Sequence, residues 1–364
     1  MSRRYQNPVA IRFNAGSIAE LPDVLAGRNA VLVTFPEAGE LGLTARLKLI
    51  LGAALVGVES QIEPNPDVDS LAPMYERFWR EHANCETVVA VGGGSTIDTA
   101  KALMVGTASG GFDELIALLS RGTQFTPHRV KKLIAVPTTA GTGSEVTPWA
   151  TIWDRNAGKK HSLHLVETWP EAAIVDPDLM LTLPRSVTIQ SALDALSHSL
   201  ESIWNINANP ISDTFAVAAA REVMSTLPAL LDTPNDRTLR SRMALAALQA
   251  GLAFSNTKTA LAHSISYEMT LRFGLPHGIA CSFTLPMVLE RAIGRDRDRE
   301  AVLASVFDGD LAGAPAKLRA FIESVGISTE FRAYGVDEEE SQRMVAQALD
   351  GVRGRNFIGA GATR

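Results

Sequence analysis

The sequence predicts an N-terminal α/β domain over residues 1–184, followed by an all-helical domain over residues 185–364. Three observations support this fold class. Up to about Pro184, short β-branched and aliphatic runs alternate with helix-length segments, as expected for a parallel sheet covered by helices. Beyond Pro184 the strand pattern ends, and long Ala- and Leu-rich segments follow at helical spacing. The length of 364 residues accommodates two domains of roughly 150 residues or more.

The N-terminal half contains four runs that are apolar on both faces, as buried parallel strands are. Helices are expected between them, over 41–51 and 69–83. A parallel sheet binds its ligands at the carboxyl ends of its strands, so the loops that follow these runs are the places to search for a site. The four expected strands are 30–35, 87–91, 133–136 and 172–175.

The C-terminal half is expected to consist of helices. A proline and a capping serine, Pro184 and Ser186, mark the start of the first one. The tail 351–364 is rich in glycine and arginine and is expected to be loose. The expected helices are 186–204, 212–231, 239–254 and 300–325.

Composition excludes several function classes. The chain has 34 basic and 40 acidic residues, and this net charge of −6 argues against nucleic acid or an anionic membrane as the main partner. Two cysteines, Cys85 and Cys281, are too few for a disulfide framework. The first eight residues lead into no apolar run, and no apolar stretch approaches the ~20 residues of a membrane helix. We therefore expect a soluble, cytoplasmic protein that binds neither nucleic acid nor membrane.

A glycine-rich loop, 92–98, follows directly on the strand expected to end at Val91, and a helix is expected from Thr99 to Val105. Glycines let the backbone approach a pyrophosphate closely, and a helix N-terminus adds free N–H groups and a partial positive charge. The loop lacks the GxGxxG fingerprint of dinucleotide-binding proteins. A tight strand-to-helix turn is therefore an equal alternative for this loop taken alone.

A second loop, 137–146, follows the next strand and contains four hydroxyl side chains among small residues. Two donor-rich loops at the ends of neighbouring strands form a plausible cradle for two phosphates. Together they favour a nucleotide site. The candidate cofactor-binding residues in the two loops are Gly92, Gly93, Gly94, Ser95, Asp98, Thr138, Thr139 and Thr142.

Four residues of the helical half form a candidate metal site. Asp194 and His198 are four apart in one expected helix, so both side chains leave the same face. His263 lies on a second apolar helix, and His277 lies at a turn before another apolar segment. One carboxylate and three imidazoles suit a divalent first-row metal. The alternative remains open, because a single histidine on an apolar helix is more often a core residue than a ligand.

These motifs, in this order, resemble the iron-containing (group III) alcohol dehydrogenases. The resemblance rests on 92–95 with Asp98, on 137–146 and 194–198, and on His263 and the Pro-His-Gly sequence 276–278, and it runs from about Tyr5 to about Met287. It implies a Rossmann-like N-terminal domain and a helical C-terminal domain, the dehydroquinate synthase-like fold. It also implies hydride transfer between NAD(H) or NADP(H) and an alcohol or aldehyde at a catalytic Fe or Zn. The residues that the resemblance assigns are Asp194, His198, His263 and His277 as metal ligands, and Lys160 near the cofactor ribose.

Two segments, 202–213 and 254–263, resemble the branch of this family that reduces phosphonoacetaldehyde to 2-hydroxyethylphosphonate in phosphonate metabolism. The alternatives are a maleylacetate reductase, a general short-chain alcohol dehydrogenase, and a metal-assisted lyase resembling dehydroquinate synthase. An anionic substrate needs a cation. Lys258, expected at a helix start near Asn256, is the first candidate, with Thr257 and Thr259 as neighbouring donors. Arg272 is the second candidate.

The sequence departs from the family pattern at Tyr267, where many members carry a histidine near the nicotinamide. A phenol has a reference pKa near ~10 and replaces an imidazole poorly as a proton relay, so Tyr267 is expected to shape the pocket. Phe35 stands where many members carry an aspartate that repels a 2′-phosphate, which predicts that NADPH is tolerated. Soluble dehydrogenases are commonly dimers or larger, so we expect a homodimer.

Overall fold

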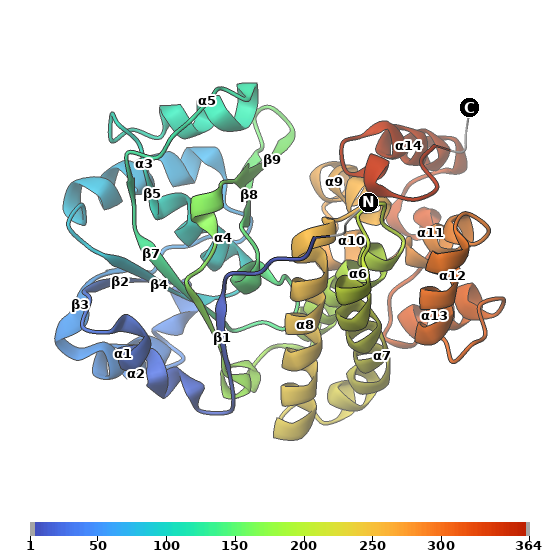
Figure 1. Cartoon of the computed structure of the whole chain (residues 1–364), viewed down its shortest axis with the longest axis horizontal. Coiled ribbons are helices and arrows are strands. Elements are labelled where there is room, and N and C mark those ends of the chain that lie inside the picture. The colour runs from blue at the N-terminus through green and yellow to red at the C-terminus, as the bar shows by residue number, and fades with distance from the viewer. Residues whose placement is uncertain (1–3, 362–364) are drawn as a thin grey trace. The chain divides into compact units, whose positions relative to one another are not determined.

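The computed structural model describes residues 4–361 and divides them into two units. The first, the sheet unit, comprises Pro8–Thr139 and Ser144–Met180. The second, the helical unit, comprises 4–7, Ala140–Gly143 and 181–361 (Figure 1). The predicted fold class, an α/β domain followed by a helical domain, is confirmed. The predicted boundary between residues 184 and 185 stays a prediction.

The sheet unit is built on a parallel sheet, to which the described residues contribute six strands in the order β1-β10-β7-β4-β2-β3. In its middle, Val91 pairs with Val136 and Gly92 with Pro137. Strands β4 and β7 therefore end side by side, and the two loops predicted to bind phosphate begin at the same edge of the sheet. The strands are β1 (Ala10–Phe13), β2 (Ala30–Thr34), β3 (Leu55–Glu59), β4 (Thr87–Gly92), β7 (Lys132–Pro137) and β10 (Ala172–Val175).

The strand order contains a reversal between β2 and β4. From β2 the chain moves outward to β3, and it then returns to β4 on the other side of β2. The connections that leave β2 and β4 therefore run in opposite directions and leave a crevice at their carboxyl ends, where open α/β sheets bind ligands. The glycine-rich loop after Gly92 lies at this reversal.

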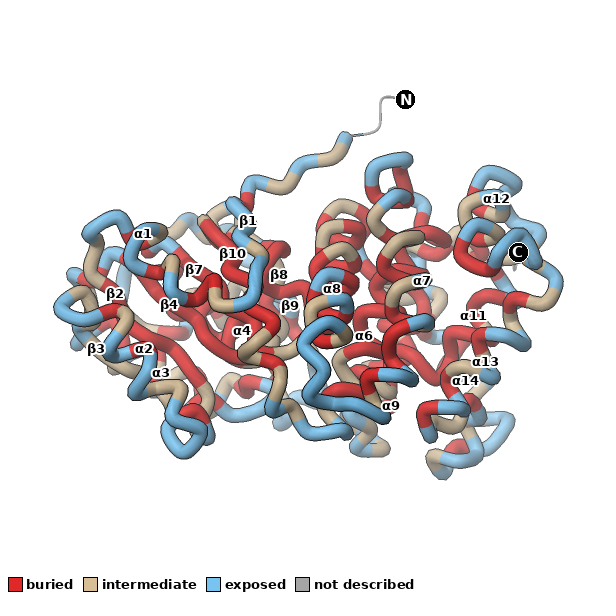
Figure 2. The backbone as a smooth tube through the Cα atoms, turned by 90° about the horizontal axis from the view of Figure 1, so that it is seen from below, coloured by how far each residue is buried: buried red, intermediate tan, exposed pale blue. Residues whose placement is uncertain are grey.

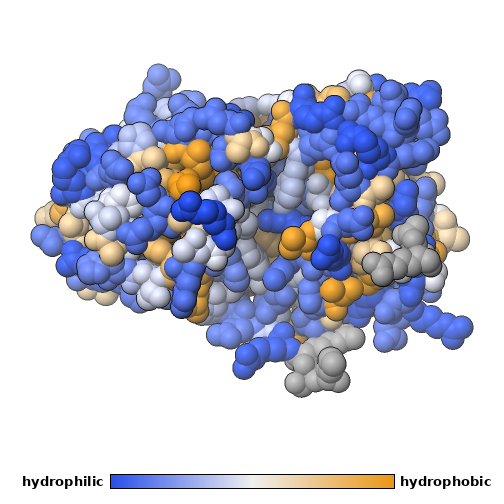
Figure 3. Space-filling view, turned by 90° about the horizontal axis from the view of Figure 1, so that it is seen from above, coloured by the Kyte–Doolittle hydropathy of each residue, from blue (hydrophilic) through white to orange (hydrophobic). Residues whose placement is uncertain are grey.

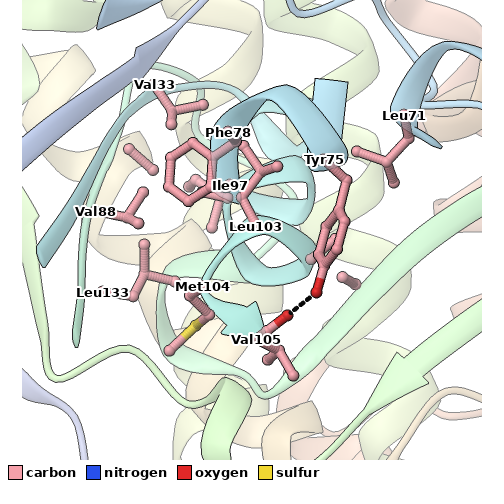
Figure 4. Close-up of a cluster of buried hydrophobic side chains, with 14 of the residues drawn as sticks. Val33, Leu71, Tyr75, Phe78, Val88, Ile97, Leu103, Met104, Val105 and Leu133 are labelled. Atoms are coloured by element: carbon pink, nitrogen blue, oxygen red, sulfur yellow. Dashed lines mark hydrogen bonds between the residues drawn. The ribbon is translucent and has the colours of Figure 1, made fainter. Parts of the chain in front are cut away.

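The sheet has a hydrophobic core on each face because its central strands alternate between the two. On β4, Val88 and Ala90 belong to one core, and Val89 and Val91 belong to the other. The first core contains Tyr75, whose hydroxyl donates to the Val105 carbonyl at 2.6 Å (Figure 4). The helices of this unit are α1 (Leu21–Leu25), α2 (Leu43–Leu51), α3 (Val68–Glu81), α4 (Gly94–Leu103) and α5 (Asp113–Arg121), and its short strands are β5 (Val105–Gly106), β6 (Arg129–Val130), β8 (Trp149–Asp154) and β9 (Lys159–His164).

The helical unit is centred on α6, which is buried without interruption from Ala192 to Ile203 (Figure 2). Helices α7 and α8 pack against it and against each other. Polar residues on such a buried helix need partners within the protein: the Ser199 and Ser202 hydroxyls each donate to the carbonyl one turn earlier at 2.7 Å, and other polar residues of α6 form the site described below. The helices are α6 (Arg185–Ile203), α7 (Pro210–Asp232), α8 (Arg237–Thr257), α9 (Leu261–Phe273), α10 (His277–Ala280), α11 (Leu285–Ala292), α12 (Arg297–Val306), α13 (Ala314–Ser324) and α14 (Glu338–Asp350).

Two expected helices differ in the structure. The single helix expected over 300–325 is two helices, α12 and α13, because Asp308 and Gly309 adopt positive φ angles of 56° and 85° that end α12. The helix expected from Thr99 begins five residues earlier, at Gly94. The glycine-rich loop is therefore shorter than expected, and most of its residues form the first turn of α4.

The expectation of a loose C-terminal tail was wrong for the part of the tail that the structure describes. Phe357 is buried and pairs with Asn205 in an isolated β-bridge. The Ile206 amide donates to the Asn356 carbonyl at 2.8 Å, and the Ile358 amide donates to the Trp204 carbonyl at 3.2 Å. One large aromatic side chain and a few backbone hydrogen bonds anchor a segment whose composition alone predicts a loop.

One helix in the described part of the chain, α7, is long and apolar enough to cross a membrane by length and composition. Its inward-facing residues, including Val223 and Leu227, are fully buried within the helical unit, and Arg221 and Glu222 lie at its middle. These features are those of a core helix. On the molecular face in Figure 3, hydrophobic residues form small groups among hydrophilic ones.

Candidate metal and cofactor sites

The metal ligands predicted from the sequence lie together in the helical unit. Asp194 and His198 project from one face of α6 and are both buried, with 3.7 Å between Asp194 Oδ1 and His198 Nε2. His263, in the first turn of α9, places its Nε2 3.5 Å from the same oxygen. The rings of His198 and His263 stack at a centroid distance of 4.7 Å, and His277, the first residue of α10, lies edge-on to His263 at 5.5 Å.

His263 is oriented by a residue that the sequence reasoning missed. Its Nδ1 lies 2.8 Å from the Oε2 atom of Glu201, a fully buried carboxylate on α6. A carboxylate at that distance holds the proton on Nδ1 and directs the lone pair of Nε2 away, toward Asp194. The signal was present, because Glu201 follows Asp194 by seven residues and so lies on the same face of α6.

Glu201 also determines where α9 begins. Its two oxygens accept hydrogen bonds from the backbone amides of Ala260 at 2.8 Å, Ala262 at 2.5 Å and His263 at 3.3 Å. These are the unpaired amides at the start of the helix, where a negative charge is favourable. One buried carboxylate thus joins α6 to the first turn of α9 and fixes the backbone from which His263 projects.

Cys281 is a further member of the cluster that sequence reasoning did not assign. Its thiol lies 3.2 Å from Asp194 Oδ1, and the ligand atoms of Asp194, His263, His277 and Cys281 all lie within 4.8 Å of one another. Its spacing of four residues from His277 puts it on the same side of that short helical segment. The thiol donates to the carboxylate, so Cys281 helps to orient Asp194.

The protonation of the cluster suits a cation. Burial lowers the pKa of His198 to about 4, so its imidazole is neutral at neutral pH, as a metal ligand must be. Burial alone would raise the pKa of Asp194, but the protonated forms of the neighbouring imidazoles, His198 first, favour its carboxylate and hold that pKa well below its usual range. Burial alone would lower the pKa of His263, but the carboxylates of Glu201 and Asp194 outweigh it and raise that pKa.

These residues fit a divalent metal. His263 Nε2 is buried and has no hydrogen-bond partner in the structure as described, although it points at a carboxylate. An imidazole nitrogen left bare in a buried cluster of one carboxylate and three histidines is what a metal-binding site requires. Asp194, His198, His263 and His277 are the residues that could hold the ion.

The two glycine and threonine loops meet in the sheet unit. A side chain at Gly92 would collide with Thr96, whose Oγ1 lies 2.3 Å from the position of the added Cβ atom. A side chain at Gly93 would meet Thr139 of the second loop at 3.4 Å. The Ser95 hydroxyl accepts a hydrogen bond from the Asn65 amide at 3.0 Å. The two loops are therefore adjacent, as predicted, and at Gly92 a side chain would clash with Thr96.

Asp98, predicted to bind the cofactor, has hydrogen-bond partners within the sheet unit, and its cofactor contact stays a prediction. Its two oxygens accept hydrogen bonds from the Ser144 hydroxyl at 2.6 Å and the Thr151 amide at 2.8 Å. Ser144 also accepts from the buried ammonium of Lys101 at 2.7 Å. Asp98 therefore joins α4 to the second loop and to β8. A buried carboxylate is stable there because these donors replace water.

Thr142 and Lys160 have surroundings of their own. Thr142 lies within the second loop, in its segment Ala140–Gly143, which belongs to the helical unit. There, a side chain at Gly141 would lie 2.5 Å from the Ser191 carbonyl, and one at Gly143 would lie 2.6 Å from Gly251. Lys160 lies on β9, with its ammonium 5.2 Å from the centroid of the Trp153 ring.

Lys258 does not start a helix. It follows the last residue of α8, with a positive φ of 66° and ψ of 174°, a conformation otherwise left to glycine. Its carbonyl accepts from the Asn205 side chain at 3.1 Å, and its side chain is exposed. The expected conflict between a lysine and a helix N-terminus is therefore absent, because a cation at a helix C-terminus is favourable.

The other residues predicted around an anionic substrate are already engaged. The buried hydroxyl of Thr257 bonds to Ser202 at 3.1 Å, and that of Thr259 accepts from Arg353 at 2.7 Å. Arg272 lies on the surface in ion pairs with Glu268 and Glu340. Tyr267, one turn after His263 on α9, is buried enough that its pKa rises to about 12.

Comparison with known proteins agrees with this arrangement. Residues 8–177 match the family described as iron-containing alcohol dehydrogenase, and residues 188–361 match its C-terminal family. The NAD-dependent methanol dehydrogenase of Bacillus methanolicus is 32% identical over 95% of this chain and 93% of its own length. The chain belongs to the iron-containing alcohol dehydrogenase family.

Two further relatives act on anionic aldehydes, according to their names. The phosphonoacetaldehyde reductase of Streptomyces viridochromogenes is 34% identical over 69% of this chain and 68% of its own. The sulfoacetaldehyde reductase of Bifidobacterium kashiwanohense, solved in complex with NAD⁺, superposes with a TM-score of 0.89 at 29% identity, covering 98% of this chain and 95% of its own. The predicted family, enzyme class and cofactor classes, a divalent metal and a nicotinamide dinucleotide, are confirmed at family level.

Proposed function

We propose that this alcohol dehydrogenase reduces a two-carbon aldehyde carrying an anionic head, phosphonoacetaldehyde, to 2-hydroxyethylphosphonate. The proposal is carried by the buried cluster of Asp194, His198, His263 and His277, which supplies a complete donor set for a divalent ion. The choice of substrate is supported by the two relatives named for phosphonoacetaldehyde and sulfoacetaldehyde. The homodimer expected from the sequence is part of the same proposal.

In the proposed reaction, a hydride from NADH adds to the carbonyl carbon, a proton adds to the oxygen, and NAD⁺ and the alcohol leave. A divalent metal held by the four ligands supplies Lewis-acid polarisation of the carbonyl oxygen. A nicotinamide cofactor would supply the hydride, with its phosphates at Gly92, Gly93, Gly94, Ser95, Thr138 and Thr139, because α4 begins at Gly94 and the free amides of a helix N-terminus favour an anion.

Other residues of the chain orient the metal ligands or lie close to them. Glu201 holds the His263 ring in the tautomer that a metal requires, and Cys281 holds Asp194 by a hydrogen bond. Tyr267, with a pKa of about 12, keeps its proton at neutral pH. It therefore lines the pocket as a neutral phenol, and the proton that reaches the product comes through water or through protein and cofactor hydroxyls.

The enzyme is proposed to accept both NADH and NADPH. Phe35 directly follows β2, beside the reversal of strand order, and offers no carboxylate to repel a 2′-phosphate. Lys160 is proposed to contact the cofactor ribose. A preference for NADH over NADPH beyond about a thousandfold, or roughly 4 kcal/mol, would contradict this part of the proposal.

The test is a substrate comparison on protein reconstituted with Fe²⁺ or Zn²⁺, following NADH absorbance with phosphonoacetaldehyde, sulfoacetaldehyde, maleylacetate and propanal. The proposal expects kcat/KM to be highest for phosphonoacetaldehyde. Preference for propanal would leave a general alcohol dehydrogenase, and preference for maleylacetate would leave that branch of the family. Absence of net NADH consumption with every aldehyde would favour a lyase that uses NAD only transiently.

A further inference from the structure

Arg353 contacts two residues that flank the candidate ligand His263 in the sequence, Thr259 and Tyr267. It belongs to the C-terminal segment that follows α14 and is only partly exposed. Its Nη1 donates to the Thr259 hydroxyl at 2.7 Å, and its guanidinium carbon lies 5.4 Å from the centroid of the Tyr267 ring. Thr259 precedes His263 by four residues and Tyr267 follows it by four, so Arg353 contacts residues on both sides of this candidate ligand.

The backbone around Arg353 is fixed on the same elements. The Asn356 side chain donates to the Thr259 carbonyl at 2.8 Å, and the Ile358 amide donates to the Trp204 carbonyl at 3.2 Å. Phe357 is buried between these contacts. The position of Arg353 is therefore set by the C-terminal segment as a whole, and its guanidinium is held by a hydroxyl on one side and an aromatic face on the other.

Arg353 differs from the other cations near α9 in its charge balance. Arg272 and Arg343 both form ion pairs with Glu268 and Glu340. Arg353 has no carboxylate partner anywhere in residues 4–361, and only its bond to Thr259 occupies the guanidinium. Its remaining guanidinium nitrogens are not among the buried polar atoms that lack a partner, so they reach solvent and are available to an incoming anion.

We propose that Arg353 is the residue that binds the anionic head of the substrate. The inference rests on the proposed function and assigns the substrate class to a specific residue. The rigid fork of a guanidinium matches two oxygens of a tetrahedral anion, and because Nη1 is partly engaged, Nε and Nη2 remain for the phosphonate. A guanidinium already held in place loses little entropy on binding.

The position of Lys258 gives it a smaller role in binding the anion than the sequence predicted. Its side chain is exposed and has no partner in the structure that orients it, so it contributes a diffuse positive charge and no fixed hydrogen bond. Thr259 acts through Arg353, as a positioning residue. An anionic aldehyde should therefore depend on Arg353 strongly and on Lys258 weakly.

The experiment compares Arg353→Gln with Arg355→Gln, because Arg355 lies two residues away in the same segment but is exposed and bonds only to the Asp350 carbonyl. In Arg353→Gln, kcat/KM for phosphonoacetaldehyde should fall by ~10²-fold, as for loss of a charged hydrogen-bond partner, while kcat/KM for propanal stays within about twofold. Arg355→Gln should change neither value. Binding of methylphosphonate, measured by calorimetry without turnover, should be lost in Arg353→Gln alone.

Sulfoacetaldehyde tests the role of the charge of the head group. In Arg353→Gln, kcat/KM should fall further for the phosphonate dianion than for the sulfonate monoanion. Equal losses for propanal and phosphonoacetaldehyde in Arg353→Gln would overturn the inference, as would a full loss in Lys258→Ala with none in Arg353→Gln. Both results would leave the proposed function standing if the wild-type protein prefers phosphonoacetaldehyde. Wild-type preference for propanal would instead remove the proposed function.

Discussion

Replacing Glu201 with glutamine tests whether this carboxylate builds the metal site. Each of its oxygens accepts two hydrogen bonds: Oε2 from the Ala260 amide and His263 Nδ1, and Oε1 from the amides of Ala262 and His263. A glutamine has one accepting oxygen and one donating nitrogen. In either orientation its NH₂ group therefore faces two N–H donors, and two buried hydrogen bonds are lost.

The two lost hydrogen bonds set the expected loss of stability. A buried polar group left without its partner costs about 1–3 kcal/mol, so two lost bonds should lower the free energy of unfolding of the metal-free protein by about 2–6 kcal/mol. His263 loses the acceptor that fixes its tautomer if the NH₂ group replaces Oε2, and in the other orientation it keeps an acceptor without the negative charge; in both cases metal affinity should fall, by roughly 10–100-fold at most, or about 1.4–2.7 kcal/mol. Both losses arise from one substitution that changes the side-chain volume very little.

The assay measures the two losses separately. Urea unfolding in the presence of a chelator reports the stability of the metal-free protein, and competition with a chromophoric chelator reports the dissociation constant of Zn²⁺. Glu268→Gln is the matched control, because Glu268 lies on α9, the helix whose first turn Glu201 caps, but forms only partly exposed ion pairs, worth about 0–1 kcal/mol. The reasoning is refuted if Glu201→Gln binds Zn²⁺ as tightly as the wild-type protein and unfolds like the Glu268→Gln control.

Four further outcomes are expected. His277→Ala should abolish both stoichiometric metal binding and turnover, and full activity without bound metal would contradict the site. Cys281→Ala should weaken metal binding by about 10–100-fold, whereas Cys281→Ser, which keeps a hydrogen-bond donor to Asp194, should not weaken it. A sulfur-to-metal charge-transfer band in the Co²⁺ protein would show instead that Cys281 is a metal ligand. Tyr267→Phe should cost less than ~10-fold in kcat, because a phenol with a pKa of about 12 does not relay protons at neutral pH; a loss of two orders of magnitude would make it a catalytic acid. Burial raises the pKa of Glu145 to about 7, so the folded protein binds the proton of this carboxyl more tightly than the unfolded chain does. The resulting contribution to the free energy of unfolding is fully present below about pH 4 and is lost as the pH rises through 7. Urea unfolding across this range should show that loss in the wild-type protein and a flatter profile in Glu145→Gln.

Much of the architecture and candidate site was predictable because it is written in local patterns. The doubly apolar runs around Val31, Val88 and Ile134 are strands of the sheet, and the spacing of Asp194 and His198 places both on one face of α6. Lys258 shows the limit of such reasoning. The sequence favoured a helix start near Asn256, whereas the preceding helix, α8, continues through Thr257 and ends there.

The sequence by itself determined which residues could be strands, which could be helices and which could bind a metal, because these properties depend on side-chain type and on periods of two and 3.6 residues. Only the tertiary structure decided which distant groups meet. Glu201 reaches His263 across 62 positions, Cys281 reaches Asp194 across 87, and Arg353 reaches Thr259 across 94. Such pairs leave no local periodicity, because a hydrogen bond between two elements depends on how their buried faces pack and not on the spacing within either one.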